Sequence, residues 1–123
     1  MIRNKNNSSI LHLPITCSTG EKCNTYNEYL RSNHWQHIKY RYYFVSKLQK
    51  SCFVCGSFNE RNLHHGTYKR VGNENMQDLI VLCKKHHKET HVLFKEDPNV
   101  NQCGLWKAYK KIRKNYRKNK IKV

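Results

Sequence analysis

The chain has 123 residues, of which 37% are hydrophobic, and its mean hydropathy is -0.93; this leaves room for one small domain and excludes two full hydrophobic cores. Its 24 lysines and arginines against 8 acidic residues give a formal net charge of +16, which predicts a polyanionic partner, with nucleic acid ahead of anionic lipid. No apolar run is long enough for a membrane span, and the patch at 10–13 is too short and polar for a signal peptide. We therefore expect no membrane partner, and a cytoplasmic protein whose cysteines stay reduced.

Residues 1–25 are predicted to form an N-terminal arm. They are rich in Asn, Ser and Thr and show weak periodicity, so we expect a loosely packed lead-in. Cys17 and Cys23 lie in this arm at a spacing that is unusual for a zinc site. We interpret them as two free cysteines.

A helix signal begins at Ser32, which is a suitable N-cap residue. Apolar residues then recur at steps of three and four, as in the buried face of a helix: Trp35, Ile38, Tyr42, Val45 and Leu48. The aromatic members could stack on bases, but this spacing favours a role in the core. The lysines and arginines off this stripe remain able to contact phosphate.

Two pairs of ligands predict a zinc knuckle: Cys52-x2-Cys55 and Cys83-x2-His86. A single CxxC motif is also typical of redox proteins, but a second pair at the same spacing favours a tetrahedral zinc ion. Four protein ligands leave no position for a substrate, so this zinc is expected to be structural. Cys103 is an alternative fourth ligand that has no paired partner.

Four further histidines remain, in two groups: His64 with His65, and His87 with His91. Two histidines four residues apart share one face of a helix, whereas the adjacent His86 and His87 point about 100° apart and can serve two different metals. Residues 79–82 predict a buried strand, so strand, loop, strand and helix give a ββα unit. The alternative, that these are ordinary surface histidines, is disfavoured by their grouping.

Beyond a loop that contains Pro98 and Gly104, apolar residues at helical spacing predict a second amphipathic helix: Leu105, Trp106, Tyr109, Ile112 and Tyr116. Nine lysines and arginines lie between residues 107 and 122, Lys110 and Lys114 among them, and no acidic residue follows Asp97. We interpret residues 98–123 as a basic helix or tail that binds phosphate without sequence preference. The alternative is a solvated face.

The combined pattern resembles the His-Asn-His (HNH) endonuclease family: Cys52-x2-Cys55, Leu63-His64-His65, Gly72-x-Glu74, Asp78-Leu79-x2-Leu82-Cys83-x2-His86-His87-x3-His91. The resemblance covers about residues 26–92 and leaves out the arm and the tail. It implies an α+β fold with a small ββα-metal core, braced by a structural zinc knuckle and flanked by N- and C-terminal helices. Residues 26–97 would then be the nuclease domain.

The resemblance also implies roles for single residues. His64, His87 and His91 would bind a catalytic divalent ion, and His65 would be the general base that takes a proton from the attacking water. Asp78 stands at the family's Asn position, where it could bind the ion or orient the His65 loop. Apart from the resemblance, three cationic residues are candidates for clamping the phosphate, although they could equally be solvated: Lys69, Arg70 and Lys88.

The identity of the catalytic ion depends on Asp78. A carboxylate ligand would favour Mg²⁺ or Mn²⁺, whereas an all-imidazole site would favour Ni²⁺ or Zn²⁺. His86 stands where many family members have a fourth knuckle cysteine, and it preserves zinc-ligand chemistry.

These expectations describe a metal-dependent endonuclease that hydrolyses DNA phosphodiester bonds. The main alternative is a noncatalytic zinc-knuckle protein that binds DNA or RNA in a salt-sensitive way and cuts neither. A ribosomal type of RNA-binding protein would leave the four histidines without a purpose. The abundance of Asn and Lys suggests an A·T-rich genome, which fits a phage or mobile element and the cytoplasm of a bacterial or phage-infected cell.

Overall fold

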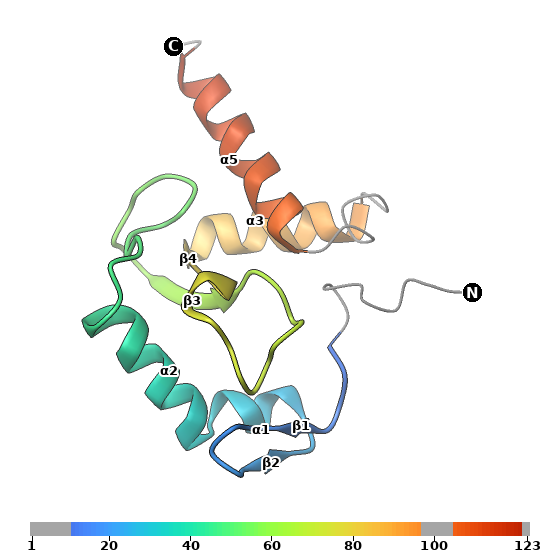
Figure 1. The fold of residues 1–123 in the computed structure, drawn as a ribbon. Helices are drawn as coiled ribbons and strands as arrows, with labels where there is room; N and C mark the ends of the chain where they lie inside the picture. The colour runs from blue at the N-terminus through green and yellow to red at the C-terminus, as the bar shows by residue number, and fades with distance from the viewer. Residues whose placement is uncertain (1–10, 97–104, 122–123) are drawn as a thin grey trace.

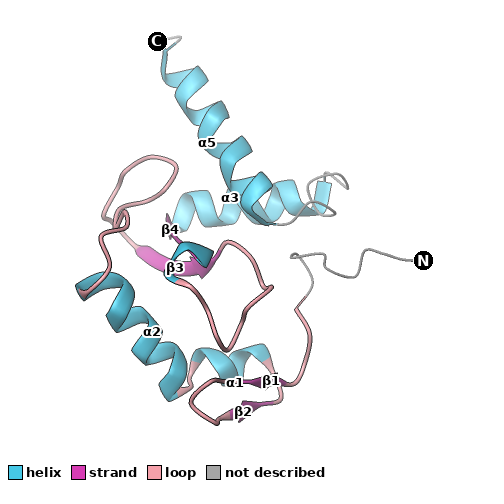
Figure 2. Ribbon diagram, in the orientation of Figure 1, coloured by secondary structure: helices cyan, strands magenta, loops and turns pink. Residues whose placement is uncertain are grey.

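The computed structural model describes residues 11–96 and 105–121. Within these ranges it is a small mixed α and β fold, with two short two-stranded sheets and four α-helices (Figures 1 and 2). No helix in these ranges combines the length and the apolar composition that crossing a membrane requires. The predicted loop at Pro98 and Gly104, and Cys103, lie outside the described residues.

The second half of the expected N-terminal arm is packed rather than loose. Strand β1 (Ile15–Thr16) pairs antiparallel with β2 (Lys22–Cys23). The side chains of Ile15, Cys17 and Cys23 are buried in the main hydrophobic cluster. The sequence could not show this packing, because each strand is too short to carry a pattern of alternation.

Two helices follow this hairpin. Helix α1 (Tyr26–Leu30) is capped by Thr25, and α2 (Asn33–Phe44) is capped by Ser32, whose side chain accepts a hydrogen bond from the Trp35 backbone. The predicted N-cap at Ser32 is therefore confirmed. The predicted stripe is buried at Trp35, Ile38 and Tyr42, but α2 ends at Phe44 and leaves Val45 exposed.

The centre of the fold is an antiparallel hairpin of β3 (Arg61–His65) and β4 (Leu79–Cys83). A 3-10 helix (Met76–Asp78) leads into β4, and α3 (Lys84–Glu96) follows it directly. Because side chains alternate along a strand, Leu63, Leu79 and Val81 join the cluster under α1 and α2, while Ile80 and Leu82 join a second cluster. The hairpin thus separates two small cores.

Helix α5 (Leu105–Ile121) lies across α3 and extends away from the hairpin (Figure 1). It covers the second core with the predicted apolar stripe, from Trp106 through Tyr109 and Ile112 to Tyr116. The amphipathic helix predicted from the sequence is confirmed. Its apolar face makes it part of the domain, and its cationic residues lie mostly on the exposed side.

Candidate functional site

The four predicted zinc-knuckle residues lie together. Cys52 and Cys55 stand in a turn before β3, Cys83 ends β4, and His86 lies in the first turn of α3. Their ligand atoms are all within 4.8 Å of one another. Gly56 has a φ of 78°, which glycine adopts without strain in the turn that follows the second thiol.

The spacing of these atoms fits a tetrahedral zinc ion. With Zn–S bonds of about 2.3 Å, two sulfur ligands of a tetrahedron lie about 3.8 Å apart. The Sγ atoms of Cys55 and Cys83 are 3.9 Å apart, and Cys52 Sγ lies 3.8 Å from His86 Nδ1. These sulfurs are too far apart for a disulfide bond, whose length is about 2.05 Å. Cys52, Cys55, Cys83 and His86 can therefore hold a metal ion, which is compatible with structural zinc.

The surroundings of the knuckle shift the pKa values of Cys52, Cys55 and His86 in different directions. Burial raises the pKa of the Cys52 thiol, but backbone N–H groups directed at it outweigh burial and lower that pKa. Burial raises the pKa of Cys55 to about 11, and burial lowers the pKa of His86, which favours its neutral form. A divalent ion favours thiolate at every cysteine and neutral imidazole at the histidine, so it would stabilise the whole set.

Three histidines meet beside the hairpin. The His64 ring on β3 stacks on the His87 ring on α3, with centroids 3.9 Å apart. One helical turn further on, His91 Nε2 lies 2.8 Å from His87 Nε2. The three line a cavity of about 480 Å³ that has no carboxylate among its lining residues. We call His64, His87 and His91 the histidine trio.

The surroundings of His64 and His87 favour neutral rings that can bind a metal, but the two stacked rings are not yet oriented to share one ion. Burial, reinforced by the neighbouring imidazoles, lowers the pKa of His64 to about 3, and burial lowers the pKa of His87. Neutral imidazoles keep a lone pair for a metal. Among the described residues, however, the knuckle is the one group of three or more side chains whose ligand atoms lie close enough together to hold a metal ion. Binding an ion at the trio requires the stacked rings of His64 and His87 to rotate.

His65 lines the same cavity but lies in the core. Its side chain is 1% exposed, its ring stacks on Trp35, and both ring nitrogens have a partner. Nε2 lies 2.7 Å from Glu74 Oε2, and Nδ1 lies 2.9 Å from Tyr26 Oη. Because a carboxylate only accepts hydrogen bonds, a neutral His65 carries its hydrogen on Nε2, and Nδ1 accepts from the tyrosine hydroxyl.

Glu74 is a buried carboxylate that joins three elements of the fold. Besides His65 on β3, it accepts a hydrogen bond from the Tyr29 hydroxyl on α1, and its Oε1 lies 2.8 Å from His34 Nε2 on α2. Burial raises the pKa of Glu74, but the hydrogen bonds from His65, Tyr29 and His34 outweigh it and lower the pKa to about 2. Ionised Glu74 therefore stabilises the fold.

This shift makes stability depend on pH in a defined window. Ionised Glu74 stabilises the folded state fully above pH 4.5, its reference pKa, and this contribution is lost as the pH falls towards 2. The shift corresponds to about 3 kcal/mol. We expect urea unfolding to show wild type more stable than Glu74→Gln by about this amount at neutral pH, with the difference shrinking through that window.

Acid would release any metal ion held by the knuckle from both proteins alike, so the difference between them isolates Glu74. Glu89→Gln, which removes an exposed carboxylate from α3, should match wild type throughout. A difference between wild type and Glu74→Gln that stays constant with pH would contradict the assignment.

Asp78 does not join the histidine trio. Arg70 Nε and Nη2 donate to its two carboxylate oxygens at 2.8 and 2.5 Å, and the Asn75 backbone donates to Oδ2. Asp78 is also absent from the residues that line the trio's cavity. Arg70, expected to clamp phosphate, is therefore committed to this ion pair, and Asp78 is not placed to bind a metal alongside the trio.

The other predicted phosphate ligands are exposed. Lys69 lies in the loop after β3, Lys88 on α3, and Lys110 and Lys114 on the outer side of α5. Lys39 of α2, one of the cations off the buried stripe that were expected to be able to contact phosphate, lines the histidine cavity. No other lysine or arginine is among the residues that line this cavity.

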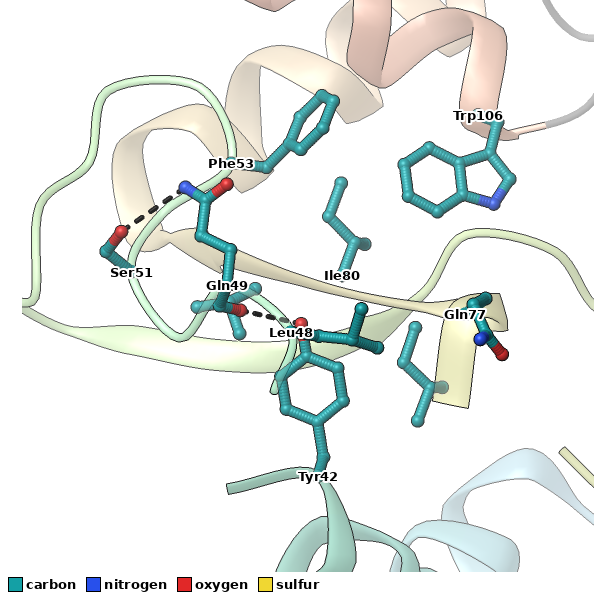
Figure 3. Close-up of a pocket in the computed structure, with 10 residues that line it drawn as sticks. Tyr42, Leu48, Gln49, Ser51, Phe53, Gln77, Ile80 and Trp106 are labelled. Carbon is teal, nitrogen blue, oxygen red and sulfur yellow. Dashed lines mark hydrogen bonds between the residues drawn. The ribbon is translucent and has the colours of Figure 1, made fainter. Parts of the chain in front are cut away.

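A second cavity, of about 290 Å³, lies between the end of α2, the knuckle turn, β4 and α5 (Figure 3). Its lining includes Leu48, Phe53, Ile80 and Trp106, and it contains no histidine, cysteine or charged group. The Tyr42 hydroxyl donates to the Gln49 carbonyl at 2.6 Å at its edge. The apolar residues around this cavity belong to the packing of the fold, and its lining includes no group suited to acid–base or metal chemistry.

The sequence analysis did not identify the two partners of His65: Tyr26 was not singled out, and Glu74 was quoted in the Gly72-x-Glu74 motif without a role. Tyr26 and Glu74 lie 39 and 9 residues from it in the chain, and neither spacing belongs to a local motif. One signal was available for Glu74, since it is one of only 8 acidic residues and follows closely after Gly72, whose φ is 96°.

Comparisons of the chain with protein-family models, curated proteins and solved structures found no match.

Proposed function

We propose that the chain is a metal-dependent endonuclease of the HNH type that hydrolyses DNA phosphodiester bonds. The observation that carries the proposal is the histidine trio, which comes from one strand and one helix and shares its cavity with His65. A structural role alone does not call for four histidines around one open cavity. In this proposal β3, β4 and α3 form the ββα-metal core, and the knuckle holds structural zinc.

The residues divide the chemistry between them. A divalent ion held by His64, His87 and His91 would supply positive charge at the scissile phosphate and at the leaving oxygen. His65 acts as general base through Nδ1, because Glu74 fixes the hydrogen on Nε2. Water takes the place of the Tyr26 hydroxyl at Nδ1, and His65 accepts its proton as the water attacks phosphorus.

The cations of the chain provide the contacts to DNA. Lys39 lines the cavity itself, and Lys84 and Lys88 are exposed on α3 beside the trio. The exposed lysines and arginines of α5 add further positive charge for contacts to the DNA backbone. Contacts of this kind bind the phosphate backbone without reading sequence.

The test is cleavage of supercoiled plasmid in the presence of single divalent ions. Because the trio offers only imidazole, and Arg70 holds the Asp78 carboxylate, we expect Ni²⁺ or Zn²⁺ to support faster cleavage than Mg²⁺ at equal concentration. Replacing His87 by alanine should abolish that preference. A highest rate with Mg²⁺ would point to a carboxylate ligand and would contradict the all-imidazole site.

One observation favours the noncatalytic alternative. His65 is almost fully buried and both of its ring nitrogens are engaged, which suits a residue that only holds the core together. A protein of this kind would bind DNA through its cations and would not cut it with any divalent ion. The plasmid assay separates the two functions.

A further inference from the structure

Helix α2 has an apolar surface that the core does not use. Tyr40, Phe44 and Val45 are 57%, 76% and 65% exposed. The two rings lie against each other, with centroids 5.2 Å apart at an angle of 35°. Neither ring belongs to the two hydrophobic clusters of the described residues. We call Tyr40 and Phe44 the aromatic pair.

The aromatic pair lies opposite the buried face of its helix. Residues four apart share one side of a helix, so Tyr40 and Phe44 form a single surface, whereas Trp35, Ile38 and Tyr42 are buried on the other side. Neighbouring large apolar side chains that remain in solvent usually mark a contact site. The core therefore accounts for the inner stripe of α2 and leaves the outer pair unexplained.

The charge around the aromatic pair indicates what covers it. Residues 29–59 contain no Asp or Glu and five cations. Two of them, Arg41 and Lys47, are exposed near the pair, and Lys39 lines the histidine cavity. This environment attracts a polyanion. It disfavours a second copy of a chain that carries a net charge of +16.

We infer that the aromatic pair is a stacking platform for unpaired bases of the nucleic acid whose backbone the neighbouring cations bind. The inference rests on the proposed function for its partner, and it adds a substrate class: DNA with a single-stranded or opened stretch. Every base has a face on which an aromatic ring can stack, and such stacking tolerates any sequence. In a closed duplex these faces are covered, so the platform engages only where bases are unstacked.

The experiment compares two probes that differ only in their bases. Fluorescence anisotropy at fixed salt measures the binding of a single-stranded oligothymidylate and of an abasic oligonucleotide with the same backbone. Wild type should prefer oligothymidylate by roughly tenfold or more. The double variant Tyr40→Ala with Phe44→Ala should lose that preference and keep its affinity for the abasic probe, because only the rings are removed.

Two further variants test the role of the rings. Exchanging the residues, Tyr40→Phe with Phe44→Tyr, keeps both rings and should keep the preference. Phe58→Ala removes an equally exposed aromatic residue from the knuckle loop and should leave the preference intact. Loss of preference in either of these variants would overturn the inference, as would an unchanged preference in the double alanine variant.

Two other partners for the aromatic pair, an anionic lipid surface and a second copy of the chain, give different results. The inference is overturned if the double alanine variant loses binding to phosphatidylserine–phosphatidylcholine vesicles while it keeps the base preference, or if it converts a dimer into a monomer in sedimentation. Plasmid cleavage is measured in parallel. If wild type cleaves plasmid but shows no base preference, the stacking platform is contradicted and the nuclease proposal stands. If it shows base preference but no cleavage, the platform stands and the nuclease proposal is contradicted.

Discussion

The His65→Gln variant is expected to cleave plasmid about 10²- to 10⁴-fold more slowly than wild type, the range that a general base contributes, while its zinc content and DNA binding stay unchanged. Glutamine has no basic nitrogen, so it cannot take a proton from water. Its side-chain amide can still donate a hydrogen bond to Glu74, which limits the cost of leaving that buried carboxylate without a partner. Initial rates on supercoiled plasmid measure the effect.

Two controls accompany this variant. His12→Ala removes an exposed histidine that does not line the cavity and should cleave like wild type. Tyr26→Phe removes the hydroxyl at His65 Nδ1 and keeps the base, so it should also remain active. A folded His65→Gln protein that cleaves at the rate of wild type would show that another group is the base.

Removing the knuckle metal is expected to unfold the chain. Cys52 and Cys55 precede β3, Cys83 ends β4 and His86 lies in the first turn of α3, so a metal ion bound here would link segments that each have little core of their own. Structural zinc contributes about 10–16 kcal/mol in isolated zinc-finger peptides, which equals or exceeds the stability of a typical small domain. Circular dichroism should show loss of helix when a strong chelator is added or when Cys83 is replaced by serine.

Cys23→Ser is the matched control, because Cys23 is also a buried free cysteine but is not part of the knuckle. It should keep one tightly held zinc ion per chain by elemental analysis. Retention of wild-type helicity and urea stability after complete metal removal would show that the two hydrophobic clusters suffice to fold the chain.

The parts of the structure that the sequence predicted are those governed by local spacing. The N-cap at Ser32, the buried stripe of α2, the strand that ends at Cys83 and the paired ligands of the knuckle all depend on residues a few positions apart. Such patterns follow from the periods of helices and strands and from the geometry of a tight turn. The approach of the two knuckle pairs over the intervening chain was inferred from their matching chemistry, and it is confirmed.

The partners of buried polar groups could not be predicted in the same way. Asp78 pairs with Arg70 rather than with the trio, and Glu74 collects His34, Tyr29 and His65 from three elements. Many cations compete for each of the few carboxylates in this chain. The choice among them depends on which side chains the folded hairpin brings together, which no local spacing encodes.

Helix α5 limits how far this protein can be shortened or varied. The Trp106 indole packs so closely on Gly66 that a Cβ there would lie 2.4 Å from its Cε2. Tyr109 donates to the His65 carbonyl at 3.1 Å, and the Tyr116 ring contacts the knuckle ligand His86. A library of substitutions along α5 should therefore show intolerance recurring every three or four positions and greater tolerance at the exposed Lys110 and Lys114, so a minimal version of the protein must keep this helix as far as Tyr116.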